Sequence, residues 1–233
     1  MTPHLPAAFL RLPLAHRALH DVSKGRPENS RAAIEAAIAA GYGIEIDVQM
    51  SADSQAMVFH DHALDRLTYD AGAVRLRTAE ALGQIPLRGG AEGIPDLPEV
   101  LSLVRGRVPL LIEIKDQDGA MGPNVGPLEA AVAEALARYR GPAAVMSFNP
   151  YSVAKMANLL PDMPRGLVTS AYEYSEWPLP NAVCDHLRGI PDYDKVGASF
   201  ISHELADLGR DRVTELKAAG ADILCWTVTS PTE

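Results

Sequence analysis

The chain has 233 residues, of which 47% are hydrophobic and 22% are charged, and its formal net charge is -9 at pH 7. This length suits one α/β barrel or two small domains, and the composition excludes general disorder. The negative charge argues against nucleic acid or an anionic membrane surface as a partner, because both would repel it. The two cysteines, Cys184 and Cys225, have neither metal-like spacing nor the pattern of a disulfide framework. No apolar run reaches the ~20 residues of a membrane span, and prolines break the N-terminal apolar patches, so we expect a cytoplasmic protein without stable membrane insertion.

The first quarter of the chain alternates between predicted strands and one helix. The apolar run 12–15 predicts a buried strand, and a polar loop separates it from a helix that starts at Arg31 and ends at Gly41. Residues 43–48 alternate β-branched and acidic side chains, which is typical of a strand with period two. A third strand ends at His60. A strand, a helix and a strand in succession predict parallel packing with right-handed crossovers.

The remainder of the chain continues this alternation after one interruption. Residues 61–97 are rich in polar residues, glycine and proline, and we interpret them as an insertion over one end of a barrel, not as a second domain. After the insertion, strands are predicted at 108–115, 143–148, 166–169, 196–202 and 223–228, and helices at 98–104, 127–139, 151–160 and 210–219. The pattern predicts a single TIM-type (β/α)8 barrel domain over residues 1–233, whose chemistry lies at the carboxyl ends of the strands.

The predicted strand 43–48 carries Glu45 and Asp47 on one face and apolar residues on the other. Two like charges side by side repel each other, and without a cation between them the pKa of one would rise. A hard divalent cation removes that repulsion and prefers oxygen ligands. The alternative is a solvated edge strand with a polar face.

Several other predicted strands end in polar or aromatic residues, which a barrel would bring to one rim: His16, Arg17, His60, Asp61, Glu113, Lys115 and Trp226. Three carboxylates can hold one Mg²⁺ or Ca²⁺, and two histidines can serve as general acid and general base near neutral pH. Arg17 and Lys115 can neutralise phosphate oxygens. Such a set suits the cleavage of a phosphodiester.

These motifs resemble, in their order, those of the glycerophosphodiester phosphodiesterase family, and the resemblance runs from about residue 12 to the end of the chain. The motifs are His16-Arg17, residues 27–30, residues 43–48, His60-Asp61 with residues 65–68, residues 113–115 and residues 226–228. The resemblance implies a TIM barrel that hydrolyses glycerophosphodiesters to sn-glycerol 3-phosphate and an alcohol with one divalent metal ion. It implies Glu45, Asp47 and Glu113 as metal ligands and His16 and His60 as the catalytic pair. It also implies Arg17 and Lys115 as phosphate-binding residues and Glu28 as a residue that orients the first strand or approaches the metal.

The sequence departs from the family pattern at three places. Ala18 stands where the family usually has glycine, and its Cβ could restrict the approach of the backbone to phosphate. Thr229 stands where the family usually has asparagine. The chain stops at Glu233, before the family's last helix and strand, so we expect a missing C-terminal unit, because an unpaired barrel strand would leave an exposed edge.

Some roles have alternatives that the sequence leaves open. Lys115 could form an internal salt bridge instead of binding phosphate, and Trp226 could pack in the core instead of lining the substrate site. For the whole protein, the alternatives are a phospholipase-type enzyme that releases a cyclic phosphate, a non-catalytic barrel that binds a phosphorylated ligand, and a metal-dependent sugar isomerase or aldolase.

Overall fold

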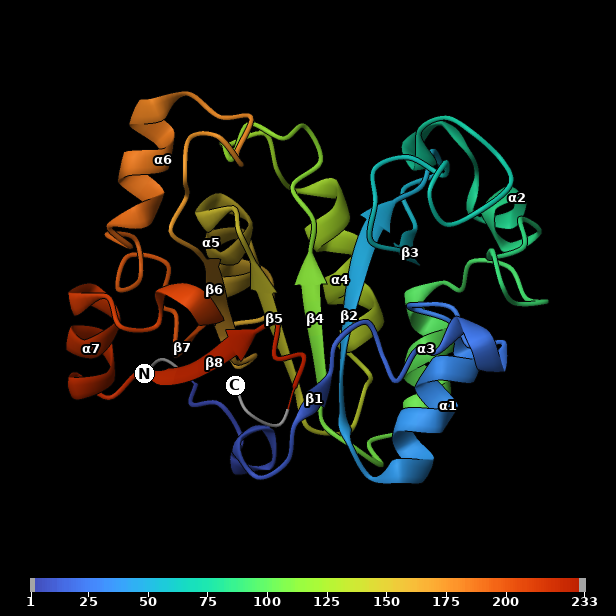
Figure 1. Ribbon diagram of the computed structural model, residues 1–233, viewed down its shortest axis with the longest axis horizontal. Helices are drawn as coiled ribbons and strands as arrows, with labels where there is room; N and C mark the ends of the chain where they lie inside the picture. The colour runs from blue at the N-terminus through green and yellow to red at the C-terminus, as the bar shows by residue number, and fades with distance from the viewer. Residues whose placement is uncertain (1–2, 231–233) are drawn as a thin grey trace.

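The computed structural model describes residues 3–230 and contains one eight-stranded sheet that curves into a barrel with helices around it (Figure 1). Its parallel strands follow one another in the order β1 (Leu14–Ala15), β2 (Gly43–Met50), β4 (Leu110–Ile114), β5 (Ala143–Ser147), β6 (Arg165–Thr169), β7 (Phe200–Glu204) and β8 (Asp222–Trp226). The predicted barrel is therefore confirmed. Within residues 3–230, β8 does not pair with β1, so the barrel has a seam between these two strands.

The strand β3 (Ala56–Val58) differs from the others in direction. It pairs with β2 alone and runs antiparallel to it, with Val58 opposite Val48. The sequence predicted β3 as a further strand of the barrel. The connection from β2 to β3 spans only residues 51–55, and a parallel crossover needs a dozen or more residues, so a hairpin is the geometry that this connection allows.

Seven α-helices accompany the sheet within residues 3–230. They are α1 (Arg31–Ala40), α2 (Ala79–Gly83), α3 (Leu97–Val104), α4 (Pro127–Leu136), α5 (Pro150–Leu159), α6 (Asn181–Arg188) and α7 (Asp211–Ala218). All but α2 lie around the sheet (Figure 1). The sequence did not predict α6, which has no side-chain cap and buries only Cys184 and Leu187. None of the helices within residues 3–230 is long and apolar enough to cross a membrane.

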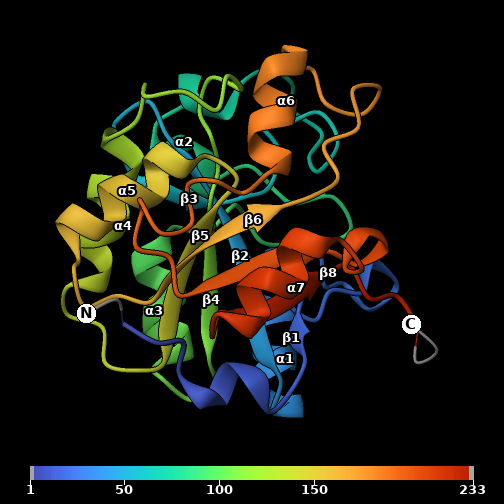
Figure 2. The ribbon, with the colours of Figure 1, turned by 90° about the vertical axis from the view of Figure 1, so that its left-hand side faces the viewer.

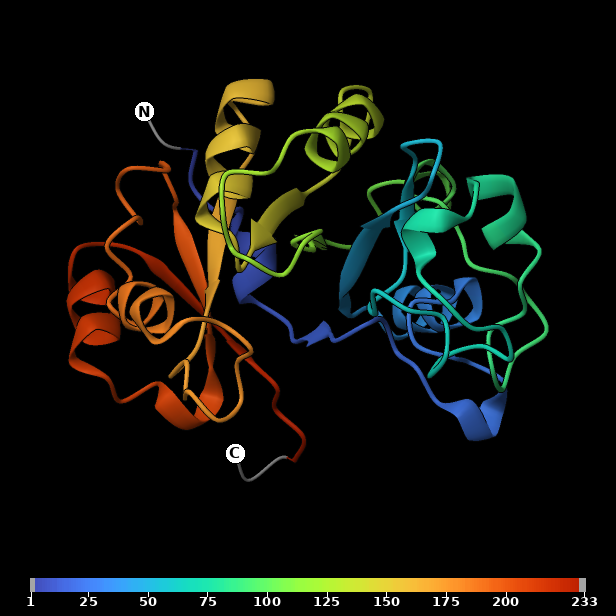
Figure 3. The same cartoon turned by 90° about the horizontal axis from the view of Figure 1, so that it is seen from above.

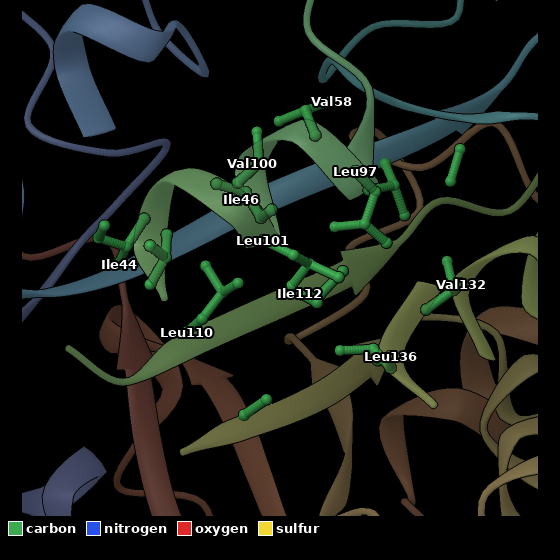
Figure 4. Packing of buried hydrophobic residues seen from close by; sticks show 14 of the residues in the cluster. Ile44, Ile46, Val58, Leu97, Val100, Leu101, Leu110, Ile112, Val132 and Leu136 are labelled. Carbon is green, nitrogen blue, oxygen red and sulfur yellow. The ribbon is translucent and has the colours of Figure 1, made fainter. Parts of the chain in front are cut away.

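The larger hydrophobic core lies between β2, β4 and the outer helices. Figure 4 shows Ile44 and Ile46 of β2 and Leu110 and Ile112 of β4 packed near α3, and all four side chains are completely buried. Burial of one such side chain contributes about 1.5–3 kcal/mol to stability. Because side chains alternate along a strand, this packing turns the intervening residues of β2 and β4 towards the inside of the barrel.

The amino-terminal segment closes the floor of the barrel. The short 3-10 helix η1 (Ala7–Leu10) lies below the strands (Figure 2), and Phe9 packs with Leu111 and Phe200 in the barrel interior. Gly166 of β6 makes room for this packing, because a Cβ there would lie 2.4 Å from the Phe200 ring. The interior is therefore filled at the amino-terminal ends of the strands.

The polar segment 61–97 lies over the carboxyl end of β2, at the upper right of Figure 1, and on the side of α1 away from α6 and α7 in Figure 3. It contains η3 (Val74–Leu76) and α2, and the other 3-10 helices are η2 (Val22–Lys24) and η4 (Leu205–Asp207). The segment has a small hydrophobic cluster of its own, formed by Met57, Phe59, Leu64, Val74, Leu82, Ile85, Leu87 and Ile94. This cluster fixes the position of the chain that follows His60.

Candidate active site

Three carboxylates meet inside the barrel mouth. Glu45 and Asp47 point inward from β2, and Glu113 of β4 is the register partner of Asp47. One carboxylate oxygen from each residue lies within 4.8 Å of the other two, and the three residues are 5%, 1% and 7% exposed. The alternation that buries the isoleucines of β2 and β4 on the outer face thus brings these carboxylates together on the inner face.

Positive and neutral donors surround this group. Lys115 Nζ lies 2.7 Å from Asp47 Oδ1 and 2.5 Å from Glu113 Oε1. Asn29 Nδ2 donates a hydrogen bond of 2.9 Å to Asp47 Oδ2, and the backbone N–H of Arg17 donates one of 2.8 Å to Glu45 Oε2. Lys115 therefore forms the internal ion pair that the sequence left open as an alternative to phosphate binding.

The pKa values of these buried groups shift in different directions. Burial, together with the charges of Asp47 and Glu113, raises the pKa of Glu45 well above its ordinary value. Burial also raises the pKa of Glu113, although Lys115 opposes the change. Burial acts in the same direction on Asp47, but Lys115 outweighs it and lowers the pKa of this carboxyl group. Burial acts to lower the pKa of Lys115, yet the two adjacent carboxylates raise it.

The surroundings of Glu45 Oε1 indicate whether the three carboxylates can hold a cation. This oxygen is buried and has no hydrogen-bond partner within residues 3–230, whereas Oε2 of the same carboxylate is satisfied. A buried polar atom without a partner costs about 1–3 kcal/mol. Hard divalent cations prefer clustered carboxylate oxygens, and a cation would also relieve the repulsion that raises the pKa of Glu45 and Glu113. The donor set fits Mg²⁺ or Ca²⁺.

His16 follows β1 and lies close to the carboxylates. Burial, followed by the positive charge of Arg17, lowers the pKa of His16 to about 4, while the charge of Asp47 acts in the opposite direction. The charges of His60 and Lys115 also act on this ring. His16 is therefore uncharged at neutral pH and can accept a proton.

His60 follows β3, and its ring is oriented by Asp61. His60 Nδ1 lies 2.6 Å from Asp61 Oδ1. Burial opposes ionisation of Asp61, but hydrogen bonds from His60 and Arg66 lower its pKa, so the carboxylate is ionised and can only accept. The proton of this hydrogen bond therefore belongs to Nδ1, and Nε2 is left to exchange protons.

A chain of ion pairs joins the two histidine-bearing segments. Arg66 donates to Asp61 from Nε (2.7 Å) and Nη2 (2.8 Å), and to Glu28 from Nη1 (3.0 Å) and Nη2 (2.9 Å). Glu28 Oε1 also accepts a hydrogen bond of 3.1 Å from Arg17 Nη1. Glu28 thus touches Arg17 in the segment after β1, and Arg66 connects it to the Asp61–His60 pair.

Ala18 adopts the left-handed backbone conformation that glycine favours. Its φ is +64°, and φ is +54° at Arg17, so two successive residues after His16 have positive φ. The Ala18 N–H donates to Glu45 O at 3.0 Å, and its side chain is buried in the large core. The Cβ therefore faces the core, and the strained turn aims the Arg17 N–H at the Glu45 carboxylate.

Sequence reasoning overlooked three polar side chains that support the site. Asn29 falls within the motif of residues 27–30 but was given no role in the site, yet it is fully buried against Asp47. Gln49 Nε2 donates to the His60 carbonyl at 2.9 Å, and Gln117 Nε2 donates to Gln49 Oε1 at 3.0 Å. Gln49 continues the inward positions of Glu45 and Asp47 along β2, which is the signal that would have found it.

Trp226 lies across the mouth from these groups, near the end of β8. Its Nε1 donates to the Ser202 carbonyl at 3.0 Å, and its ring meets Phe148 edge-on with centroids 5.7 Å apart. The ring is half-buried, so it contributes to the core and also borders the opening.

Comparison with known sequences gives consistent matches. The sequence profile of the glycerophosphoryl diester phosphodiesterase family matches residues 16–233. A putative glycerophosphodiester phosphodiesterase of Bacillus subtilis, YhdW, is 28% identical over 227 residues, which cover 93% of this chain and 86% of the relative. A glycerophosphodiester phosphodiesterase of Caldanaerobacter subterraneus is 31% identical over 176 residues, or 71% of this chain and 70% of the relative.

Solved structures with the same fold include a phosphodiesterase of Oleispira antarctica in complex with its product sn-glycerol-3-phosphate. That structure superposes with a TM-score of 0.77 at 25% identity and covers 97% of this chain and 88% of its own. The profile match spans nearly the whole chain, and both curated relatives described above carry the name of this enzyme. The protein is a phosphodiesterase that belongs to the glycerophosphoryl diester phosphodiesterase family.

Proposed function

We propose that the protein hydrolyses glycerophosphodiesters to sn-glycerol 3-phosphate and an alcohol with one divalent metal ion held by Glu45, Asp47 and Glu113. The observation that carries the metal requirement is the buried carboxylate triad with an unpartnered oxygen on Glu45. The Oleispira antarctica relative, which was solved with sn-glycerol-3-phosphate as its product, supports the reaction. The ion, when bound, supplies charge that polarises the phosphoryl group.

His16 and His60 each carry out one of the two proton transfers of the reaction. His16, which is uncharged at neutral pH, takes a proton from the attacking oxygen, either water or the adjacent glycerol hydroxyl. If the hydroxyl attacks, the cyclic phosphate that forms is opened by water in a second step to give sn-glycerol 3-phosphate. His60, oriented through Nδ1 by Asp61, gives a proton from Nε2 to the oxygen of the departing alcohol. Arg17 and Lys115 offset the negative charge of the phosphate. Lys115 does so from its place between Asp47 and Glu113.

The test is release of sn-glycerol 3-phosphate from glycerophosphocholine and glycerophosphoethanolamine, each with Mg²⁺, with Ca²⁺ and with EDTA. We expect release with metal and none with EDTA. Glu113→Gln should increase the metal concentration needed for half-maximal rate, whereas Glu134→Gln, which changes an exposed carboxylate on α4, should not. Release that persists in EDTA would contradict the metal requirement. A cyclic phosphate as the final product would favour a phospholipase-type reaction, and no release by folded protein would favour a phosphate-binding barrel.

A further inference from the structure

Four aromatic rings gather at or beyond the carboxyl ends of β5, β6 and β8. Phe148, which follows β5, lies with its ring centroid 5.1 Å from Trp177, 5.7 Å from Trp226 and 6.4 Å from Tyr172. Tyr172 is buried, whereas the other three rings are half-buried and keep an exposed part. We call Phe148, Tyr172, Trp177 and Trp226 the aromatic wall.

Glu204 places a carboxylate beside this wall. It is the last residue of β7, and its register partner is Trp226. Alternation from Phe200, which packs in the barrel interior, puts Glu204 on the same inward face. Its Oε2 accepts a hydrogen bond of 3.0 Å from the Ala171 N–H.

Most carboxylates of the mouth are paired with a basic side chain, but Glu204, like Glu45, is not so paired within residues 3–230. Asp47, Glu113, Glu28 and Asp61 each lie within ion-pair distance of a lysine or an arginine. Glu204 is therefore a half-buried carboxylate next to an aromatic ring, without a basic side chain of the described residues to offset its charge.

The aromatic wall is within reach of the reaction centre. Met146 of β5 is the register partner of Glu113, and Phe148 lies two residues farther along the same side, a rise of roughly 7 Å. Burial raises the pKa of Tyr172, and the negative charge of Glu113 raises it further, so these two groups interact. A phosphodiester held at the triad can thus extend one of its two ester arms to the wall.

We propose that the aromatic wall and Glu204 bind the leaving alcohol and that this alcohol carries an ammonium group, as choline and ethanolamine do. The proposal rests on the proposed function. Aromatic faces attract cations, and a carboxylate at their edge adds a direct charge pair. A neutral polyol would leave the Glu204 charge unpaired, and an anionic alcohol would be repelled by it. The same cationic group occurs in soluble glycerophosphocholine and in lysophosphatidylcholine, and the wild-type kcat/KM for these two compounds, measured side by side, distinguishes the two sources.

The decisive comparison uses two substrates of the same shape. One is glycerophosphocholine, and the other is the 3,3-dimethylbutyl ester of sn-glycerol 3-phosphate, in which carbon replaces the charged nitrogen. We expect wild-type kcat/KM to favour the choline ester at least ~10-fold, and Glu204→Gln to reduce this ratio about tenfold, mainly through KM, as expected for one partly screened charge pair. Glu176→Gln, which changes an exposed carboxylate in the Trp177 loop, should keep the ratio. Equal kcat/KM values for both esters in the wild type would overturn the proposal.

A second measurement does not depend on turnover. Both tryptophans of the chain belong to the aromatic wall, so intrinsic fluorescence reports on it directly. In EDTA, choline should change the emission of the wild type, and its half-saturating concentration should rise about tenfold in Glu204→Gln. The neutral 3,3-dimethylbutan-1-ol should have a much weaker effect. Equal fluorescence changes with the two alcohols, or no change with choline, would refute the ammonium site even if the enzyme hydrolyses glycerophosphodiesters. Choline binding by a protein that hydrolyses none of them would refute only the proposed reaction.

Discussion

Replacing Glu45 by glutamine should stabilise the metal-free protein while weakening its metal binding. In the folded chain Glu45 Oε1 is buried without a partner, and the carboxylates of Asp47 and Glu113 repel its charge. The substituted amide would keep an oxygen for the Arg17 N–H and turn its NH₂ group towards the two carboxylates. Removing one unpartnered buried oxygen contributes about 2 kcal/mol. For a chain of this size, that corresponds to a rise in Tm of roughly 4–8 °C.

The assay is thermal unfolding in EDTA and again with Mg²⁺, with Glu134→Gln as the control. Mg²⁺ at ~100 times its Kd should stabilise the wild type by about 2.7 kcal/mol and Glu45→Gln far less. Glu45→Gln should therefore be the more stable protein in EDTA, and the wild type the more stable one in Mg²⁺. The pH dependence carries the same information. Because the folded pKa of Glu45 is raised, the folded state retains a proton that the unfolded state loses above pH ~4.3, so the contribution of Glu45 to stability falls as the pH rises through this window. Glu45→Gln loses this contribution, while Glu113 and, with opposite sign, His16 still contribute, so the stability difference between Glu45→Gln and the wild type should widen as the pH rises. If Glu45→Gln were less stable than the wild type in EDTA, the reasoning would be refuted.

Three further outcomes test the site and the fold. His16→Ala and His60→Ala should each lower kcat by about 10²–10⁴-fold with little change in Tm. With the metal kept saturating at each pH, the wild-type rate should decline on the acid side as the pH approaches about 4, where His16 gains its proton. Steady-state rates between pH 4 and 8 check this, and an unchanged kcat in either variant would rule out its proposed role. Arg66→Ala should lower kcat by roughly tenfold with little effect on KM, because it frees the Asp61–His60 pair; Arg66→Lys, which cannot bridge two carboxylates with a planar fork, should recover only part of the rate. Gly166→Ala should reduce the free energy of unfolding by about 1–3 kcal/mol in urea, because the Cβ of the new alanine would clash with the Phe200 ring. An unchanged urea midpoint would mean that the packing around Phe200 adjusts to the added methyl group at little cost.

The inner and outer faces of β2 could be predicted from its sequence because alternation is a local property. Once the isoleucines are assigned to the core, Glu45 and Asp47 must face inward, and the same argument holds for Glu113 on β4. The direction of β3 could also have been derived from its short connection to β2. The position of α6 could not, because its helix buries little and has no capping side chain.

Contacts between segments far apart in the chain were out of reach of the sequence. The pairing of Glu204 with Trp226 depends on the register of β7 against β8, which no local pattern encodes. The choice of Lys115 between phosphate and an internal ion pair depends on the position of Asp47 in the neighbouring strand. Asn29 reaches Asp47 because its backbone, with φ of +59°, turns the side chain inward just before α1, and the sequence indicated only that Asn29 belongs to a family motif.

The small size of β1 has a consequence for how the protein loses activity. This strand contains two residues and, in the described part of the chain, has a sheet partner on one side only. His16, Arg17, Glu28 and Asn29 therefore depend on a segment held by a few hydrogen bonds, whereas Glu45, Asp47 and Glu113 belong to the strands at the centre of the sheet. Local opening of residues 14–30 would detach one histidine and leave the carboxylates assembled. Amide hydrogen exchange should then show this segment opening before the sheet unfolds, through a state that retains its metal ligands but cannot turn over substrate.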